Sequence, residues 1–230
     1  MLTTKVLFLI FSAVVFPLTT FSQDSQIPPP ADSSTTPAYG LLPSAPTHSW
    51  GIDVLISNGG LGLGAFYRKK YSDDLSGFLN FSITEARDDD EKDFVDYYGN
   101  KFTPGKINRF LTIPLFVGLE KRLFQDDIVD NFRPYVNIAA GPTMIYVFPY
   151  NEEYFNALGK GQLKYTLGGY VGMGAFFGSE QSTLLGINLR YYFLPYYFGD
   201  GIESMRVAGQ TYRKKSFGGF FITVNFGSAW

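Results

Sequence analysis

Hydrophobic and polar positions alternate with a period of two along most of the chain, and the alternation is clearest over residues 217–230. Successive side chains of a β-strand point to opposite faces, so this pattern predicts a strand with one oily face and one small, polar face. The oily face holds Phe220, Ile222, Val224, Phe226 and Trp230. The opposite face holds Thr223, Asn225, Gly227 and Ala229. A soluble sheet can produce this pattern, but here the oily face continues to the last residue, interrupted only by Ser228.

The same alternation divides the chain after residue 48 into eight segments of strand length. They are residues 49–56, 61–68, 75–84, 107–124, 132–146, 163–177, 183–193 and 217–230. Short polar turns follow the second, fourth and sixth segments, whereas long polar loops follow the third, fifth and seventh, at residues 85–106, 147–161 and 194–216. Only the first outer connection is short, a hairpin turn at residues 57–60 whose Asn and Gly accept positive φ.

An even number of strands of about ten residues, joined by alternating short turns and long loops, is typical of barrels that span a membrane. The pattern therefore predicts an all-β fold, an eight-stranded antiparallel up-and-down transmembrane β-barrel. The short turns and both termini would lie on the periplasmic side, and the long loops outside.

The N-terminal residues have the pattern of an exported protein. Lys5 precedes an apolar run over residues 6–16, and Thr20 and Ser22 offer small residues for cleavage, which predicts a signal peptide at residues 1–22. The run is shorter than the roughly 20 apolar residues that a spanning helix needs. Residues 23–47 are rich in Pro, Ser and Thr and predict a flexible periplasmic lead-in. The barrel would then comprise residues 48–230.

Composition separates a membrane barrel from a soluble one. Charged residues make up 17% of the chain, against about 25% in ordinary soluble domains, whereas aromatic residues reach 18%. The mean hydropathy of −0.01 is far from that of a helical membrane protein. A secreted lipocalin-like barrel is the soluble alternative, with the oily face turned inward. Its exterior would lack the expected Lys and Glu, and its interior would have to hold more large apolar side chains than eight strands enclose.

Charge and cysteine content exclude further classes of protein. The net charge of −2 leaves no excess of basic residues, so nucleic acid is not an expected partner. The absence of cysteine excludes disulfides, thiolate metal sites and a lipidated N-terminal cysteine.

Two resemblances add to this interpretation. The terminal strand resembles the closing strand of bacterial outer-membrane barrels, in which a C-terminal aromatic residue in register with the lipid face serves as an insertion signal. This implies that Phe220, Ile222, Val224, Phe226 and Trp230 are read by the barrel-assembly machinery. The segments at 111–115 (LTIPL), 133–142 (RPYVNIAAGP) and 186–191 (GINLRY) resemble the outer-membrane β-barrel domain family common in Bacteroidetes, which includes PorT-like proteins. That resemblance covers about residues 48 to 230 and implies an outer-membrane location, in contact with outer-membrane lipid.

The charged residues on the polar face of the strands are the most informative candidates. The alternation places them inside the barrel, where an isolated charge is costly and should pair or be hydrated. This predicted lumen charge network comprises Asp53, Arg68, Glu120, Lys164 and Arg190. Eight strands leave an interior just wide enough for side chains to fill. The sequence therefore predicts a plugged lumen with little conductance, in which Asp53 and Arg190 lie at similar depth.

Other motifs indicate little chemistry. Residues 60–65 (GLGLGA) match a loose dinucleotide fingerprint but continue into a strand where a helix is required, so lumen-facing glycines are the better interpretation. His48 is the only histidine and has neither a second histidine for zinc nor a nucleophile beside it. The acidic residues 88–91, with Asp93, form either a solvated outer loop or a site for a divalent cation. The aromatic residues 191–193 and 196–198 fit an interfacial girdle or a platform for a glycan or protein partner.

These observations predict a small integral outer-membrane barrel that is not an enzyme and has a structural or interaction role. A narrow pore or a small-ligand-binding barrel is the alternative, and a lipid-active enzyme or a secreted lipocalin-like binder is less favoured. We expect no catalytic residue, no cofactor and no metal ligand, and an unidentified protein or glycan partner at the outer loops.

Overall fold

The computed structural model describes residues 46–88, 91–99, 101–125, 128, 132–178 and 183–230. The predicted signal peptide and residues 23–45 of the predicted lead-in lie outside the described residues.

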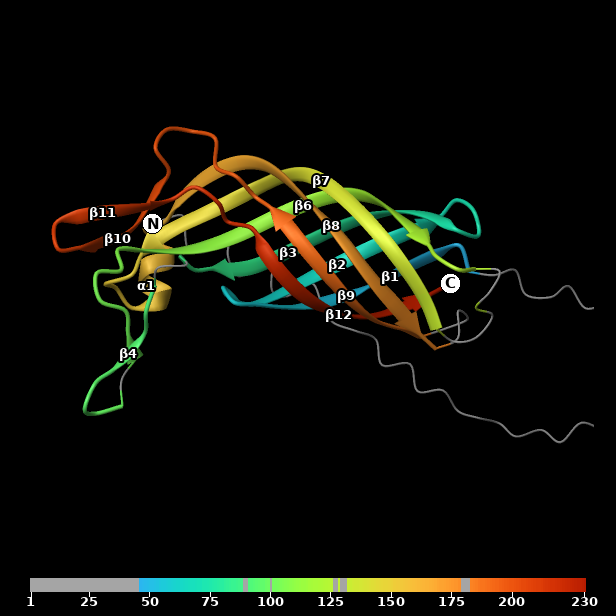
Figure 1. Cartoon of the computed structure of the whole chain (residues 1–230), viewed down its shortest axis with the longest axis horizontal. Helices are drawn as coiled ribbons and strands as arrows, with labels where there is room; N and C mark the ends of the chain where they lie inside the picture. Colours follow the sequence, from blue (N-terminus) through green and yellow to red (C-terminus); the bar gives the residue numbers. More distant parts are fainter. Residues whose placement is uncertain (1–45, 89–90, 100, 126–127, 129–131, 179–182) are drawn as a thin grey trace, which may run out of the picture. The chain divides into compact units, whose positions relative to one another are not determined.

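Eight long strands form the barrel (Figure 1), and each lies antiparallel to its neighbour. They are β1 (His48–Ser57), β2 (Gly60–Lys70), β3 (Leu75–Ala86), β6 (Asn108–Arg122), β7 (Phe132–Pro149), β8 (Gln162–Phe177), β9 (Thr183–Phe193) and β12 (Gly219–Ala229). Strands that are consecutive in this series pair with one another, and β12 pairs with β1 to close the barrel. The predicted eight-stranded antiparallel up-and-down barrel is therefore confirmed.

The closing pair holds the two ends of the barrel sequence in one register. Ser49 lies opposite Ala229, and Ser57 lies opposite Phe221. Between them Gly51 pairs with Gly227 beneath the ring of Phe66. A Cβ atom on Gly51 would overlap the carbonyl oxygen of Phe226 and lie 2.7 Å from the Phe66 ring. A glycine is needed here because backbone and ring approach one another so closely.

The three long connections contain structure that the alternation did not predict. The connection after β3 holds a hairpin of β4 (Phe94–Val95) and β5 (Lys101–Phe102), the next holds the helix α1 (Tyr154–Leu158), and the last holds a hairpin of β10 (Ile202–Val207) and β11 (Gln210–Lys214). The polar-loop interpretation of residues 85–106, 147–161 and 194–216 was therefore wrong in part. β10 is tied to the residue before β6, and α1 is tied to Tyr146 of β7. None of these short elements belongs to the barrel sheet, so no alternation of outward and inward residues marks them in the sequence. Within the described residues, no helix is long and apolar enough to cross a membrane.

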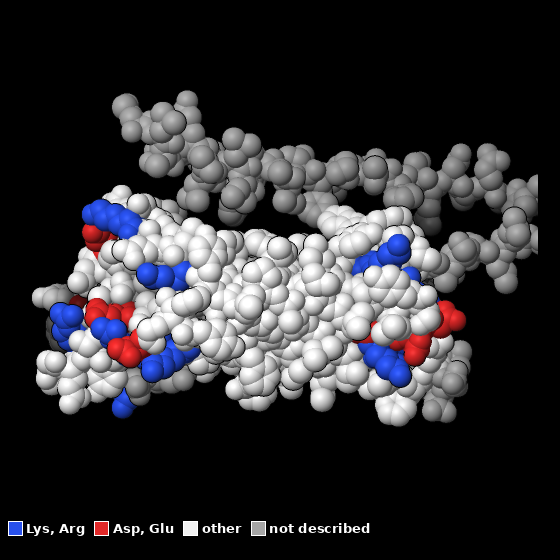
Figure 2. All heavy atoms as spheres, turned by 90° about the horizontal axis from the view of Figure 1, so that it is seen from above, with Lys and Arg blue, Asp and Glu red and all other residues white. Residues whose placement is uncertain are grey.

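The outward face of the barrel is apolar. Figure 2 shows Lys, Arg, Asp and Glu gathered toward two ends of the barrel, with an uncharged band between them. Large apolar side chains point outward from every long strand, and one from each is Ile52, Leu63, Phe81, Val117, Ile138, Leu167, Ile187 and Ile222. All eight are at least 40% exposed. Their inward neighbours are mostly buried, as the predicted alternation requires.

Candidate functional site in the barrel interior

The centre of the interior is organised around Asp53, whose side chain is fully buried on β1. Its carboxylate accepts hydrogen bonds from the side-chain amides of Asn80 on β3, at 2.8 Å, and Asn225 on β12. The Arg190 guanidinium on β9 lies 3.2 Å from the same carboxylate and forms an ion pair with it. Three strands thus supply donors to one buried anion, which is the condition under which a charge is tolerated away from water.

Aromatic side chains fill the lumen beside this ion pair. The guanidinium of Arg190 lies 5.0 Å from the centre of the Tyr170 ring, a cation–π distance. The ring of Tyr192 lies 4.9 Å from that of Tyr170 and 4.6 Å from that of Phe221. Phe116 contacts both tyrosine rings, at 5.8 and 5.9 Å. All of these rings are buried, so side chains occupy the middle of the barrel.

A second ion pair lies nearer the end with the short turns. Arg68 on β2 and Glu120 on β6 are 3.2 Å apart. The Arg68 guanidinium lies 4.3 Å from the centre of the Phe176 ring, which in turn stacks on Tyr135 at 4.5 Å. This second pair is slightly exposed, at 13% and 9% of the side chains, whereas Asp53 and Arg190 are exposed by 0% and 5%.

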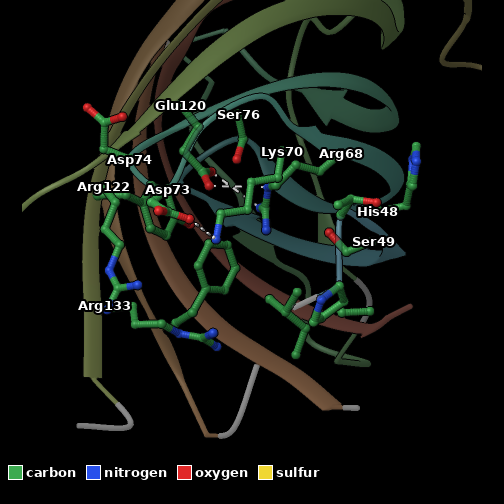
Figure 3. Close-up of a pocket in the computed structure, with 16 residues that line it drawn as sticks. His48, Ser49, Arg68, Lys70, Asp73, Asp74, Ser76, Glu120, Arg122 and Arg133 are labelled. Atoms are coloured by element: carbon green, nitrogen blue, oxygen red, sulfur yellow. Dashed lines mark hydrogen bonds and ion pairs between the residues drawn. The ribbon is translucent and has the colours of Figure 1, made fainter. Parts of the chain in front are cut away.

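The exposure comes from a cavity of about 100 Å³ at this mouth (Figure 3). Arg68 and Glu120 line it together with Lys70, Asp73 and Asp74. Lys70 forms an ion pair with Asp73 at 3.0 Å, so these two charges are also paired. The hydroxyl of Ser72 donates a 2.6 Å hydrogen bond to Asp74 and holds the pKa of that carboxyl below its ordinary value. The mouth is therefore polar and partly exposed, whereas the centre is buried.

The fifth predicted member of the lumen charge network is separate from the other four. Lys164 points inward from β8, but it lines a cavity at the opposite, outer end of the barrel. It forms no ion pair with any described residue. The structure thus places the predicted charges in two ion pairs and one separate lysine, not in one network.

At the end with the long connections, part of β10 packs on the barrel interior. Ile202 and Met205 of β10 are buried, and the ring of Phe217 packs edge-on against Phe110 at 5.2 Å. The backbone of β10 is tied to the start of β6, because the Ile107 amide donates to the Ser204 carbonyl at 2.9 Å. An apolar cluster thus covers the aromatic filling from this side.

Four residues beside β4 and β5 form a charged cluster at the same end. Lys106 pairs with Glu91 at 2.5 Å, and both side chains are almost fully buried. The Arg87 guanidinium donates a hydrogen bond to the Asp93 carboxylate, and this bond holds the pKa of Asp93 below its ordinary value. Asp89 and Asp90 lie outside the described residues, and no group of three potential metal ligands occurs among the described ones. In the part of the acidic loop that is described, Glu91 and Asp93 are held by basic side chains of the protein itself.

The structure corrects one assignment and adds a partner for one further residue. Tyr192, expected in an interfacial girdle, points into the lumen, because it alternates with the outward Tyr191 and Phe193. Asn80, which was not among the predicted site residues, donates a hydrogen bond to Asp53. The alternation itself could have placed Tyr192 correctly. It could not have identified the partner of Asn80, which lies 27 residues away in the chain.

The residues of the predicted insertion signal all point outward from the closing strand. Phe220, Ile222, Phe226 and Trp230 are exposed, and Val224 is partly buried. The ring of Trp230 stacks on His48 at 6.0 Å, and His48 lies 2.6 Å from the Tyr67 hydroxyl. The only histidine thus belongs to an aromatic contact across the barrel closure.

A closed barrel of eight strands, with an uncharged apolar outer wall and buried ion pairs inside, has the architecture of the small outer-membrane β-barrel proteins. No family model matches the sequence, and no curated protein matches it.

The chain is similar to several solved structures of outer-membrane proteins, among them the following three. Neisserial surface protein A is 9% identical, with 80% of this chain and 94% of that one covered and a TM-score of 0.48. The N-terminal β-barrel domain of OprF from Pseudomonas aeruginosa is 8% identical, with 80% and 98% covered and a TM-score of 0.44. The outer-membrane protein OprG from Pseudomonas aeruginosa is 12% identical, with 80% and 94% covered and a TM-score of 0.42. Each is a similarity of fold and not of function.

Proposed function

We propose that the protein is an integral barrel of the bacterial outer membrane, with a structural or interaction role, no enzymatic activity and a lumen closed to ions. The observation that carries this proposal is the contrast between the two faces of each strand. The outward face exposes large apolar side chains around the whole barrel, whereas the inward face holds the paired charges and the amides. In water this arrangement would expose the large apolar side chains and bury the charged ones. Lipid is the solvent in which it is favourable.

The location can be tested by fractionation after expression with the native leader in a Gram-negative host. We expect the protein in the outer-membrane pellet, and we expect its gel mobility to change after boiling, because a folded barrel binds less detergent than the unfolded chain. Recovery of the protein in the soluble periplasmic fraction would contradict the proposal and favour the lipocalin-like alternative.

The orientation follows from the lengths of the connections. We propose that the short turns and both termini face the periplasm and that the β4–β5 and β10–β11 hairpins face outward. Because the chain has no cysteine, single cysteines can be introduced and labelled on intact cells with a membrane-impermeant maleimide. We expect labelling of a Tyr97→Cys variant in the outer hairpin and none of an Asp73→Cys variant in a short turn. The reverse pattern would invert the orientation.

The closed lumen is supported by the packed rings of Tyr170, Tyr192, Phe116 and Phe221 and by Ile202 of β10, which belongs to the same buried cluster. Planar bilayers provide the test. We expect no steady single-channel current from the wild-type protein. A variant in which Phe116 and Tyr170 are both replaced by Ala should conduct more readily, because two rings leave the middle of the barrel. Large, steady currents from the wild type would favour the alternative of a narrow pore.

Insertion by the barrel-assembly machinery is part of the same proposal. Its support is that Phe220, Ile222, Val224, Phe226 and Trp230 all face outward on the closing strand. Replacing Trp230 by Ser should lower the amount of heat-modifiable protein in the membrane, whereas replacing the outward Phe193 of β9 by Ser should lower it less. Equal losses in the two variants would argue against a signal in the last strand.

The finer relationship to PorT-like proteins of Bacteroidetes also belongs to the proposal. It rests on the segments at 111–115, 133–142 and 186–191, which lie in β6, β7 and β9. A profile built from homologues of this chain should align these three segments with the same strands of PorT-like barrels. An alignment shifted by a strand would remove the relationship and leave the fold unaffected.

A further inference from the structure

The outer end of the barrel carries a cavity of about 400 Å³ that the proposed function leaves without a role. Its walls come from the beginning of β8, the β10–β11 hairpin and residues 196–201 between β9 and β10. Volumes of about 300 to 1,000 Å³ are typical of sites for small organic ligands. The cavity is therefore large enough for a ligand of that size.

Three basic and two acidic side chains line the cavity, and Glu152, just outside the lining, makes the two signs equal in number. Arg213 pairs with Glu203 at 3.2 Å, and Lys160 pairs with Glu152 at 2.7 Å. The remaining charges of the lining are one lysine, Lys164, and one aspartate, which form no ion pair within the part of the chain that the structure describes. The aspartate is Asp200, on the connection between β9 and β10. An anionic or cationic ligand would meet as much repulsion as attraction here, whereas a neutral ligand can use both groups as hydrogen-bond partners.

An aromatic surface adjoins these polar groups. Phe198 lines the cavity and is 64% exposed, although it is a large apolar side chain on a loop. Tyr196 lines it as well and packs edge-on against Phe198 at 5.8 Å. The loop is anchored at its start, because the Tyr196 amide donates to the Lys215 carbonyl at 2.7 Å. The ring of Phe198 is thus held at the cavity by a loop that is anchored to the chain before β12.

Side-chain amides complete the polar set. Gln162 lines the cavity and is exposed, and Asn108 lines it while donating to the Glu203 carbonyl at 2.8 Å. An aromatic ring, two amides, one ammonium and one carboxylate offer donors and acceptors of both kinds beside an apolar surface. Sugar rings require this combination, because they present C–H groups on one face and hydroxyls that both donate and accept around the edge.

We propose that this cavity binds a neutral, hydroxyl-rich saccharide, with the C–H face of a sugar ring against Phe198 and its hydroxyls bonded to Lys164 and Asp200. The inference rests on the proposed function, because a cavity at the long-loop end meets extracellular glycans only if that end faces outward. The proposal names neutral saccharides as the class of ligand for the proposed interaction role. It also explains why Lys164 takes no part in the two ion pairs of the lumen.

The test is calorimetric titration of the full-length protein in a zwitterionic amine-oxide detergent, since sugar-based detergents would compete. The probes are the neutral oligosaccharides maltotriose, cellotriose and diacetylchitobiose, with trigalacturonate as an anionic comparison. We expect at least one neutral probe to bind, and Phe198→Ala to weaken it about tenfold, because the stacking surface is lost. Lys164→Gln should weaken it less, since the amide still donates.

Phe155→Ala is the matched control, because Phe155 is an aromatic residue of the outer loops that is 80% exposed and does not line the cavity. It should bind like the wild type. Absence of binding by every neutral probe, binding of the anionic probe alone, or an equal loss in Phe155→Ala and Phe198→Ala would each overturn the saccharide proposal. Gel mobility before and after heating is measured on the same samples. An intact barrel that binds no sugar refutes this inference alone, whereas loss of membrane location refutes the proposed function.

Discussion

On β9, neighbouring residues lie in opposite environments. Ile187 and Leu189 point outward and are about half exposed, at 51% and 45%, whereas Asn188 and Arg190 point inward and are 0% and 4% exposed. An outward side chain has the surroundings of a uniform apolar solvent, so any large apolar residue satisfies it. An inward charge has to find a specific partner on another strand, as Arg190 finds Asp53 across 137 positions of sequence. The outer wall therefore depends on composition, and the interior depends on pairing.

The largest expected effect is inside the barrel. Asp53→Ala leaves the Arg190 guanidinium and two amides without their acceptor, and should lower the free energy of unfolding by about 3–5 kcal/mol. Urea titration in lipid vesicles, followed by the fluorescence of Trp50 and Trp230, measures it. Asp73→Ala is the control, because it removes an exposed partner of Lys70 and should cost under about 1 kcal/mol. Similar losses in the two variants would contradict the importance of inward pairing.

A charge on the outer wall should have the next largest effect. Ile187→Arg places a guanidinium in the apolar band, and a charge near the middle of a bilayer costs about 2–4 kcal/mol in a barrel. Val207→Arg puts the same charge on the β10–β11 hairpin, where the side chain is 41% exposed outside the barrel wall, and should change little. The same urea titration compares them. If Ile187→Arg were as stable as Val207→Arg, the band would not contact lipid.

The Arg68–Glu120 ion pair should be coupled more strongly than the more exposed Lys70–Asp73 pair. Arg68 and Glu120 border the cavity at the mouth, so water partly screens them, and a double-mutant cycle with Arg68→Met and Glu120→Gln should give a coupling of about 0.5–3 kcal/mol. A parallel cycle with Lys70→Met and Asp73→Asn examines the exposed pair and should give under about 1 kcal/mol. Equal couplings would show that partial burial at the mouth does not strengthen the Arg68–Glu120 pair.

The smallest expected effect is a pH dependence in the outer loops. The pKa of Asp93 is lowered from its ordinary value of 3.8, first by the hydrogen bond from Arg87 and then by that from Thr103. A carboxyl whose pKa is lower in the folded state stabilises it above pH 3.8, and this stabilisation is lost as the pH falls through the folded value. The β4–β5 hairpin should therefore loosen below pH 3.8. The anisotropy of a dye on a Tyr97→Cys variant should drop there, and Asp93→Asn should remove that pH step.

The alternation of residue types predicted the barrel well, and the reason is local. Each of Ile113, Ile187 and Ile222 takes its face from its place in the strand alone, so the eight segments and the outward side could be assigned without any knowledge of contacts. The same rule placed Asp53 and Arg190 inside. It could also have placed Tyr192 inside, but the run of aromatic residues 191–193 was interpreted as a whole and not residue by residue.

The outer connections were less predictable for the opposite reason. β10 and β11 are held by each other, by the Ile107 and Gly105 backbone and by the apolar residues beneath them, and none of these contacts leaves a periodic trace in the sequence. The sequence likewise did not predict the buried pair of Glu91 and Lys106, because Glu91 belongs to a segment that was interpreted as a solvated acidic loop. Charge alone does not reveal which carboxylate is covered.

The sequence by itself determined the number of barrel strands, their order and the face that their side chains take, because these follow from a period of two and from the lengths of the turns. Only the tertiary structure decided which inward groups meet. Closure of β12 onto β1 brings Asn225 and Asp53 together across 172 positions, and the same closed wall brings Arg190 to Asp53 while leaving Lys164 at the outer cavity. Partners across a barrel are set by its registers and by the packing of the rings between them, and no local pattern encodes either.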